Sequence, residues 1–160
     1  MSIEYFQRRQ NNLKEKIAKE YLDGMLVTNL THIRYLCGFT GSSATLLITD
    51  DQIHFITDGR YVVQSEKEVK GANVIIDSIP HYKVIKDKRL LKNGQRIGFD
   101  GNNVTHQGHQ QISKVLTGQQ LVNLTGVIES LAMIKDDKEL EAIKTAVEIT
   151  DKAFSEVLPM

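Results

Sequence analysis

The sequence predicts an α/β fold in which helices flank a mixed β-sheet. Short apolar strands alternate with amphipathic helices several times between residues 24 and 133. Two strand patterns, at 43–50 and 52–58, meet at Asp50-Asp51 with hairpin spacing, so one antiparallel pair interrupts the parallel arrangement that the alternation implies. Apolar residues are 41% and charged residues 25% of the 160 positions, a composition typical of a globular protein.

The first elements have clear local signals. A helix is predicted up to Leu22 because apolar residues recur at helical spacing, and "GMLVTN" then lacks the polar alternation of a half-exposed strand, which predicts a buried one. Asn29 or Thr31 can cap a second, short helix, and Gly38 stands where a left-handed residue ends it. The remaining predictions are helices at 59–69, 82–91, 105–116 and 127–133, and strands at 73–77, 96–100 and 120–124.

The pattern changes after residue 133. Residues 136–158 form one long helical pattern, with Asp136 or Asp137 as its cap. Its apolar stripe comprises Leu140, Ile143, Val147, Phe154 and Val157. Because such a stripe needs a packing partner, we divide the chain into a domain at 1–133 and, at 134–160, a linker with the opening helix of a second domain that the chain does not contain.

Charge and composition narrow the class of protein. Twenty basic and twenty acidic side chains cancel, so there is no global basic field for nucleic acid or an anionic membrane. The apolar runs are of strand length, and the polar start "MSIEYFQRRQ" lacks a secretory signal. The lone cysteine, Cys37, fits a reducing compartment. We therefore expect a cytoplasmic protein with neither nucleic-acid nor membrane partners.

The stretch "CGFTGSS" raises the question of a phosphate loop. Such loops follow a strand and precede a helix, whereas here a helix precedes and a strand follows. The better interpretation is structural, with Gly38 ending the helix and Gly41 forming a tight turn. Ser42 and Ser43 have no nucleophile-elbow pattern around them.

Other reactive side chains also favour structural roles. His106 and His109 could share a helix face, but the spacing suggests no third zinc ligand, and Cys37 has no assignable base. We therefore expect neither a catalytic residue nor a metal site in this chain. In "TDGRYVVQSE", Gly59 completes a turn, and Arg60 and Tyr61 are either a solvated helix start or part of a binding surface.

The two parts of the chain together carry a family resemblance. Asn29, the segment "IRYL", the loop "GFTGS" and the later "DGRY" occur in the order and spacing of the N-terminal domain of the creatinase/prolidase/aminopeptidase P family. "MIKDDKELEAIKTAVEITDKAF" resembles the opening helix of that family's pita-bread catalytic domain. The "GFTGS" loop is most similar to the Xaa-Pro peptidase branch. Two positions depart from the pattern: Ala132 stands where arginine is common, and Cys37 where threonine is common.

The resemblance implies a function for the longer protein. Family members hydrolyse peptide bonds next to proline in short peptides, using two manganese or cobalt ions held by two Asp, one His and two Glu. None of these ligands is assignable in this chain, which is expected to be inactive alone. The N-terminal domain usually forms the homodimer and restricts access to the partner's active site. Candidates for that contact are Arg34, Tyr35, Phe39, Arg60 and Tyr61.

Two other functions remain open at this stage. The fold also serves as a peptide-binding or protein-binding module in relatives whose catalytic domain has lost its ligands. It could also be an interaction domain with no downstream enzyme. Phe39 has a competing interpretation as well, because a large apolar side chain in this loop could belong to the core instead of a subunit contact.

Overall fold

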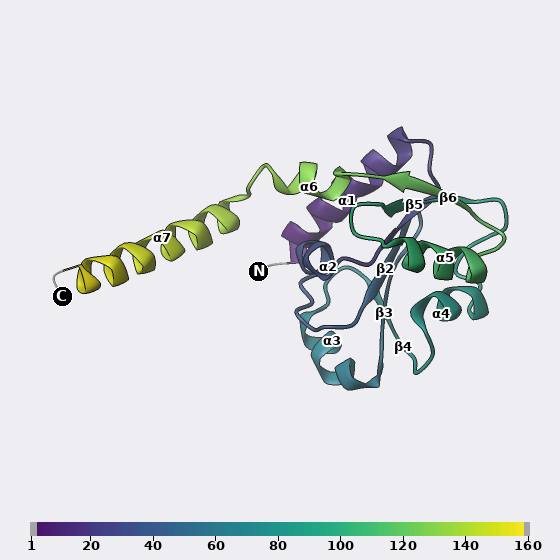
Figure 1. Cartoon of the computed structure of the whole chain (residues 1–160), viewed down its shortest axis with the longest axis horizontal. Helices are drawn as coiled ribbons and strands as arrows, with labels where there is room; N and C mark the ends of the chain where they lie inside the picture. Colours follow the sequence, from purple (N-terminus) through teal and green to yellow (C-terminus); the bar gives the residue numbers. More distant parts are fainter. Residues whose placement is uncertain (1–2, 159–160) are drawn as a thin grey trace.

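A computed structural model of the chain describes residues 3–158 and contains a six-stranded mixed sheet (Figure 1). The strand order is β4-β3-β2-β1-β5-β6. The two pairs β1–β2 and β2–β3 are antiparallel, and the other three neighbouring pairs are parallel. The predicted α/β class with a mixed sheet is confirmed. The strands are β1 (Gly24–Val27), β2 (Thr45–Thr49), β3 (Ile53–Thr57), β4 (Asn73–Ile76), β5 (Arg96–Asp100) and β6 (Gln120–Leu124).

Helices cover both faces of this sheet. The helices α1 (Ile3–Lys19), α2 (Leu30–Cys37) and α6 (Val127–Ala132) share one apolar core with the sheet, and α4 (His81–Asp87) and α5 (His106–Val115) share another. Strand β1 shows why two cores exist. Met25 and Val27 point into the first core and Leu26 into the second, because successive side chains of a strand face opposite sides. The run "GMLV" is buried at every position, as its lack of alternation predicts.

The helix predicted up to Leu22 ends at Lys19, because Tyr21 adopts a left-handed conformation (φ 56°) and Leu22 donates its amide to the Ile17 carbonyl. Two further predicted helices also differ from the observed ones. The helix predicted at 82–91 ends at Asp87, because Arg89 adopts a left-handed conformation (φ 52°) and Leu90 donates its amide to the Ile85 carbonyl. The helix predicted at 59–69 begins as a 3₁₀ turn, η1 (Gly59–Tyr61), and continues as α3 (Val62–Glu68). In both cases a local change of hydrogen-bond pattern makes the regular α-helix shorter than predicted.

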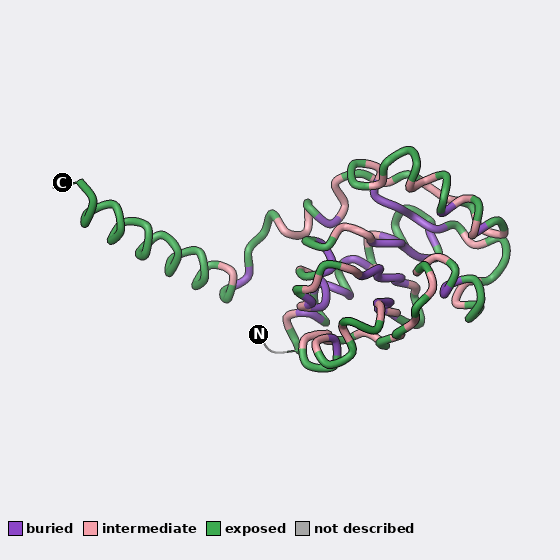
Figure 2. Tube along the Cα trace, turned by 60° about the horizontal axis from the view of Figure 1, so that its bottom comes forward, coloured by how far each residue is buried: buried purple, intermediate pink, exposed green. Residues whose placement is uncertain are grey.

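The last helix, α7 (Asp137–Val157), extends away from the sandwich of sheet and helices (Figure 1). None of its residues is buried, and Figure 2 shows the contrast with the buried strands. The five apolar side chains of the predicted stripe are between 46% and 66% exposed. Within residues 3–158, no helix is long and apolar enough to cross a membrane.

Candidate functional site

The glycine loop after α2 is a structural turn. Gly38 has a φ of 87° and donates its amide to the Arg34 carbonyl, so it ends the helix in the predicted left-handed conformation. At Gly41 any Cβ would overlap the rings of Phe39 and Tyr61. Both glycines are therefore required by backbone conformation and packing.

Phe39 lies in the core, with an exposed fraction of 1%. Its ring makes edge-to-face contacts with Phe55, at 4.7 Å between centroids, and with Tyr61, at 5.3 Å. The expectation that Phe39 stands out from the loop as a subunit contact is wrong. The loop turns its ring inward because β3 offers an aromatic partner directly beneath it.

A hydrogen-bonded cluster of polar side chains lies on the outside of the same loop. The Glu68 carboxylate accepts hydrogen bonds from the Thr40 amide at 2.8 Å, the Thr40 hydroxyl and the Gln64 side chain. Burial acts to raise the pKa of Glu68, but these hydrogen bonds outweigh it and lower the pKa. The α3 helix is thereby attached to the loop while its polar atoms stay accessible.

The predicted pair Arg60 and Tyr61 stands beside this loop. The Tyr61 hydroxyl accepts the Ser42 amide and lies 2.6 Å from the Ser42 hydroxyl, and hydrogen bonding from Ser42 lowers the pKa of Tyr61. Asp58 caps η1 and holds the exposed Arg60 guanidinium through two hydrogen bonds of 2.8 and 2.9 Å. The side-chain hydrogen bond between them lowers the pKa of Asp58 and raises that of Arg60. Asp58 therefore caps the 3₁₀ turn, and Arg60 stays on the surface.

Tyr35 belongs to a different cluster, which we call the Arg9 junction, formed by Arg9, Tyr35, Asp136 and Glu139. Arg9 is 4% exposed, and it donates to Asp136 Oδ2 at 2.6 Å and to the Tyr35 carbonyl at 2.9 Å. Its guanidinium lies 4.3 Å from the centroid of the Tyr35 ring. Burial raises the pKa of Tyr35. Arg34, the neighbouring candidate, is exposed, so the two residues do not form one site.

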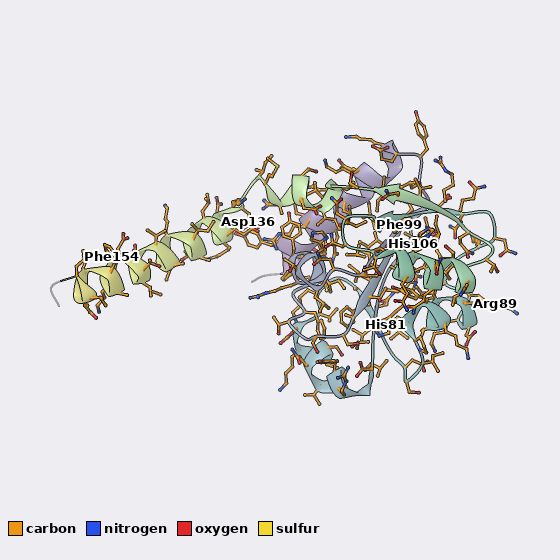
Figure 3. All side chains as sticks on the ribbon, viewed as in Figure 1. His81, Arg89, Phe99, His106, Asp136 and Phe154 are labelled. Atoms are coloured by element: carbon orange, nitrogen blue, oxygen red, sulfur yellow. The ribbon has the colours of Figure 1, made fainter. Side chains whose placement is uncertain are left out.

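The Arg9 junction fixes the start of α7. Asp136 is the N-cap of this helix and forms a capping box with Glu139. Figure 3 shows Asp136 where α7 meets the sandwich and Phe154 far out on the same helix. Nothing in the sequence pattern marked Arg9 as the partner, because 127 positions separate it from Asp136.

A second cluster was also missed by sequence reasoning. His32 on α2, Asp100 at the end of β5 and Glu129 on α6 each offer a ligand atom within 4.8 Å of the others. His32 Nδ1 lies 3.6 Å from Asp100 Oδ2, and His32 Nε2 lies 3.6 Å from Glu129 Oε1. Polar residues follow β1 and end β5, and this pattern could have indicated the cluster. The carboxyl ends of adjacent parallel strands meet at one edge of a sheet, so such residues lie close together. The sequence pattern does not show that β1 and β5 are neighbours, because these strands are far apart in the chain.

Cys37, His106 and His109, the other reactive side chains that the sequence singled out, have structural contacts. The Cys37 thiol is buried, donates to the Ile33 carbonyl, and has a pKa raised by burial to about 11, which disfavours the thiolate. His106 contacts Gln110, and the His109 ring packs 5.0 Å from Phe99. The two histidines belong to no group of three candidate metal ligands within residues 3–158.

Comparison with known proteins places these features in a family. Residues 9–134 match the model of the creatinase/prolidase N-terminal domain. An uncharacterized peptidase YqhT of Bacillus subtilis is 34% identical over 137 residues, covering 86% of this chain and 39% of the relative. The chain therefore spans about two fifths of this relative's length.

Solved structures agree with this match. An Xaa-Pro dipeptidase from Bacillus anthracis aligns with a TM-score of 0.89 at 27% identity, over 96% of this chain and 43% of that one. The N-terminal domain of the cytoplasmic peptidase PepQ from Mycobacterium tuberculosis aligns with a TM-score of 0.68 at 31% identity, over 78% of this chain and 98% of that one. The sandwich, the glycine loop and the family model thus agree: the chain belongs to the creatinase/prolidase N-terminal domain family.

Proposed function

We propose that this chain is the non-catalytic N-terminal part of a metal-dependent Xaa-Pro peptidase. The whole protein would hydrolyse peptide bonds next to proline in short peptides. Relatives described as an Xaa-Pro dipeptidase and as aminopeptidases P support this substrate class. The Cys37 thiol is buried and burial raises its pKa to about 11, which supports a non-catalytic role for the chain itself.

The exposed apolar stripe of α7 carries the proposal. The Arg9 junction and the capping box hold the start of this helix firmly, yet Val147 is 52% and Phe154 is 65% exposed. The structural similarity to the Bacillus anthracis Xaa-Pro dipeptidase covers 96% of this chain within a protein more than twice as long. These two observations support a catalytic domain in the same polypeptide as the occupant of the stripe.

The two metal ions, manganese or cobalt, belong to that catalytic domain. The family's ligand set is two Asp, one His and two Glu, and the described residues contain no such group; their single cluster has one residue of each type. The residues of this chain therefore do not fit the catalytic metal pair, and no chemical step is assigned to them.

A homodimer is the proposed setting for the exposed loop surface. Arg34 and Arg60 are exposed, and Tyr61 is half-buried at the edge of the loop, so these three can meet a partner subunit without unfolding. Tyr35 and Phe39 are committed to packing within the chain. A cytoplasmic location is proposed because of the lone buried thiol and the relative described as a cytoplasmic peptidase.

Proline release from an Xaa-Pro dipeptide and cleavage of an Xaa-Pro tripeptide, both with Mn²⁺, test this function. The product of the complete gene is expected to turn over at least one of them, and the 160-residue chain alone neither. Sedimentation of the complete product should show a dimer. Chelator-sensitive turnover by the short chain would contradict the proposal. A folded, complete protein that binds these peptides without cleaving them would favour the alternative, a peptide-binding module.

A further inference from the structure

We propose that His32, Asp100 and Glu129 form a site for one divalent transition-metal ion, for which Zn²⁺ is the appropriate probe. This site is separate from the catalytic metal pair and lies within the sandwich. His32 belongs to α2 and Glu129 to α6, which cover the same face of the sheet (Figure 1). Asp100 ends β5 on that face. One imidazole nitrogen and two carboxylates are ligand types that Zn²⁺ accepts.

The distances suit a small ion. Zn²⁺ bonds of about 2.0–2.2 Å in a tetrahedral arrangement place neighbouring ligand atoms roughly 3.3–3.6 Å apart. His32 Nδ1 and Asp100 Oδ2 are 3.6 Å apart, and one atom from each of the three residues lies within 4.8 Å of the others. Since the Glu129 side chain is 44% exposed, it can move the remaining distance and leave a position for water.

His32 Nδ1 is buried, and no atom of residues 3–158 forms a hydrogen bond with it. The residue is 8% exposed and Asp100 is 5% exposed, so water cannot readily satisfy either. When Nδ1 carries no proton, its lone pair faces a carboxylate oxygen and the two acceptors repel each other. A cation between them removes this repulsion, and a buried unpaired polar atom otherwise destabilises the fold.

A second layer of hydrogen bonds holds the two buried ligands. Asp100 Oδ1 accepts the Asn102 amide at 3.0 Å, and Oδ2 accepts the Asn103 side-chain amide. Asn103 in turn accepts a hydrogen bond from the Asn29 side chain, and Asn29 caps α2 by accepting the His32 amide. This chain of contacts links the start of α2 to the end of β5, as supporting contacts of metal ligands commonly do.

The competing interpretation requires no metal. A doubly protonated His32 could donate Nδ1–H toward Asp100 and Nε2–H toward Glu129, forming a buried ion triplet. Both N···O distances of 3.6 Å exceed the usual hydrogen-bond length of about 2.7–3.2 Å. The Nδ1–Oδ2 distance matches two ligand atoms of one ion, whereas Glu129 faces the other ring nitrogen and would move to reach that ion.

Calorimetric titration of the untagged 160-residue chain with Zn²⁺ tests the site. Because the 160-residue chain lacks the catalytic ligand set, the catalytic metal pair does not contribute to the measured Zn²⁺ binding. We expect one Zn²⁺ per chain, and saturation at 100 times the dissociation constant should raise the thermal midpoint by roughly 5–10 °C. Binding of Co²⁺ should produce the absorption spectrum of a tetrahedral site. Absence of stoichiometric binding would overturn the proposal and leave the ion triplet.

Substitutions locate the ion. Glu129→Gln and Asp100→Asn should each weaken Zn²⁺ binding at least ~100-fold, and Asn103→Ala about 10–100-fold through the supporting layer. Glu129 is partly exposed, so its variant is expected to fold even if a buried variant does not. His106→Gln is the matched control on exposed α5 and should bind normally. Binding that survives Glu129→Gln, or that disappears in His106→Gln, would place the ion elsewhere and refute the site.

Discussion

The sandwich and α7 use the same kinds of apolar residue with opposite results. Leu13, Leu26 and Leu47 are completely buried, whereas Leu140 is 46% and Phe154 is 65% exposed. Yet α7 has the more complete local signals, since it has a capping box and acidic residues in its first turn. The comparison shows that complete local helix signals do not by themselves bury an apolar stripe, because burial needs a packing partner.

Hydrogen exchange should reveal the largest difference between the two regions. An isolated amphipathic helix is marginal in water, so amides of α7 beyond its first turn should exchange within about tenfold of an unfolded chain. Amides of the central strand β1 should be protected by ~10⁴-fold or more, because they open only with the whole domain. Equal protection through Phe154 in a monomer would show that α7 is stable alone; in a dimer, it would identify a second copy as the occupant of the stripe.

Two matched phenylalanine substitutions sharpen the same comparison. Phe39→Ala removes a core ring that packs on Phe55 and should lower the free energy of unfolding by about 3–5 kcal/mol. Phe154→Ala removes an exposed ring and should change it by less than ~0.5 kcal/mol in this chain. Urea unfolding measures both. An unchanged midpoint for Phe39→Ala would restore the interpretation of Phe39 as a subunit contact.

Asp136→Asn tests the junction that joins the two regions. This substitution leaves the buried Arg9 guanidinium without its closest opposite charge. It should therefore lower the free energy of unfolding by about 3 kcal/mol at neutral pH. Asp137→Asn, at the neighbouring exposed position, is the control and should change stability by less than ~0.5 kcal/mol.

The same variant has a defined pH dependence. Burial acts to raise the pKa of Asp136, but hydrogen bonds from the Glu139 backbone and from Arg9 lower it below its ordinary value. A carboxyl with a lowered folded pKa stabilises the protein above its unfolded pKa, ~3.9, and loses that contribution as pH falls further. The gap between the wild type and Asp136→Asn should therefore shrink below about pH 4, and a gap constant down to pH 2 would exclude the charge as its cause.

Local patterns predicted much of the fold. The hairpin at Asp50-Asp51, the buried strand β1, the left-handed Gly38 and the cap of α7 all depend on neighbouring residues, and each is observed. The ends of α4 were less predictable, because Arg89 takes a left-handed conformation that the sequence favours only weakly.

The sites depended on contacts that sequence spacing does not encode. The sequence leaves Phe39 open between a subunit contact and the core, and only the three-dimensional position of Phe55 explains its burial. The pairing of Arg9 with Asp136 and the approach of His32 to Asp100 both join distant segments. The polar residues could be recognised in the sequence, but their partners could not.

The Arg9 junction also constrains the order of events during synthesis. Arg9 leaves the ribosome 127 residues before Asp136, an interval of roughly 6–25 s at ordinary elongation rates. Until then, docking α1 onto the sheet would bury a guanidinium with no carboxylate to balance it. The nascent chain can form the β2–β3 hairpin and the central strands early. Helix α1 reaches its final position against the sheet only after Asp136 has emerged.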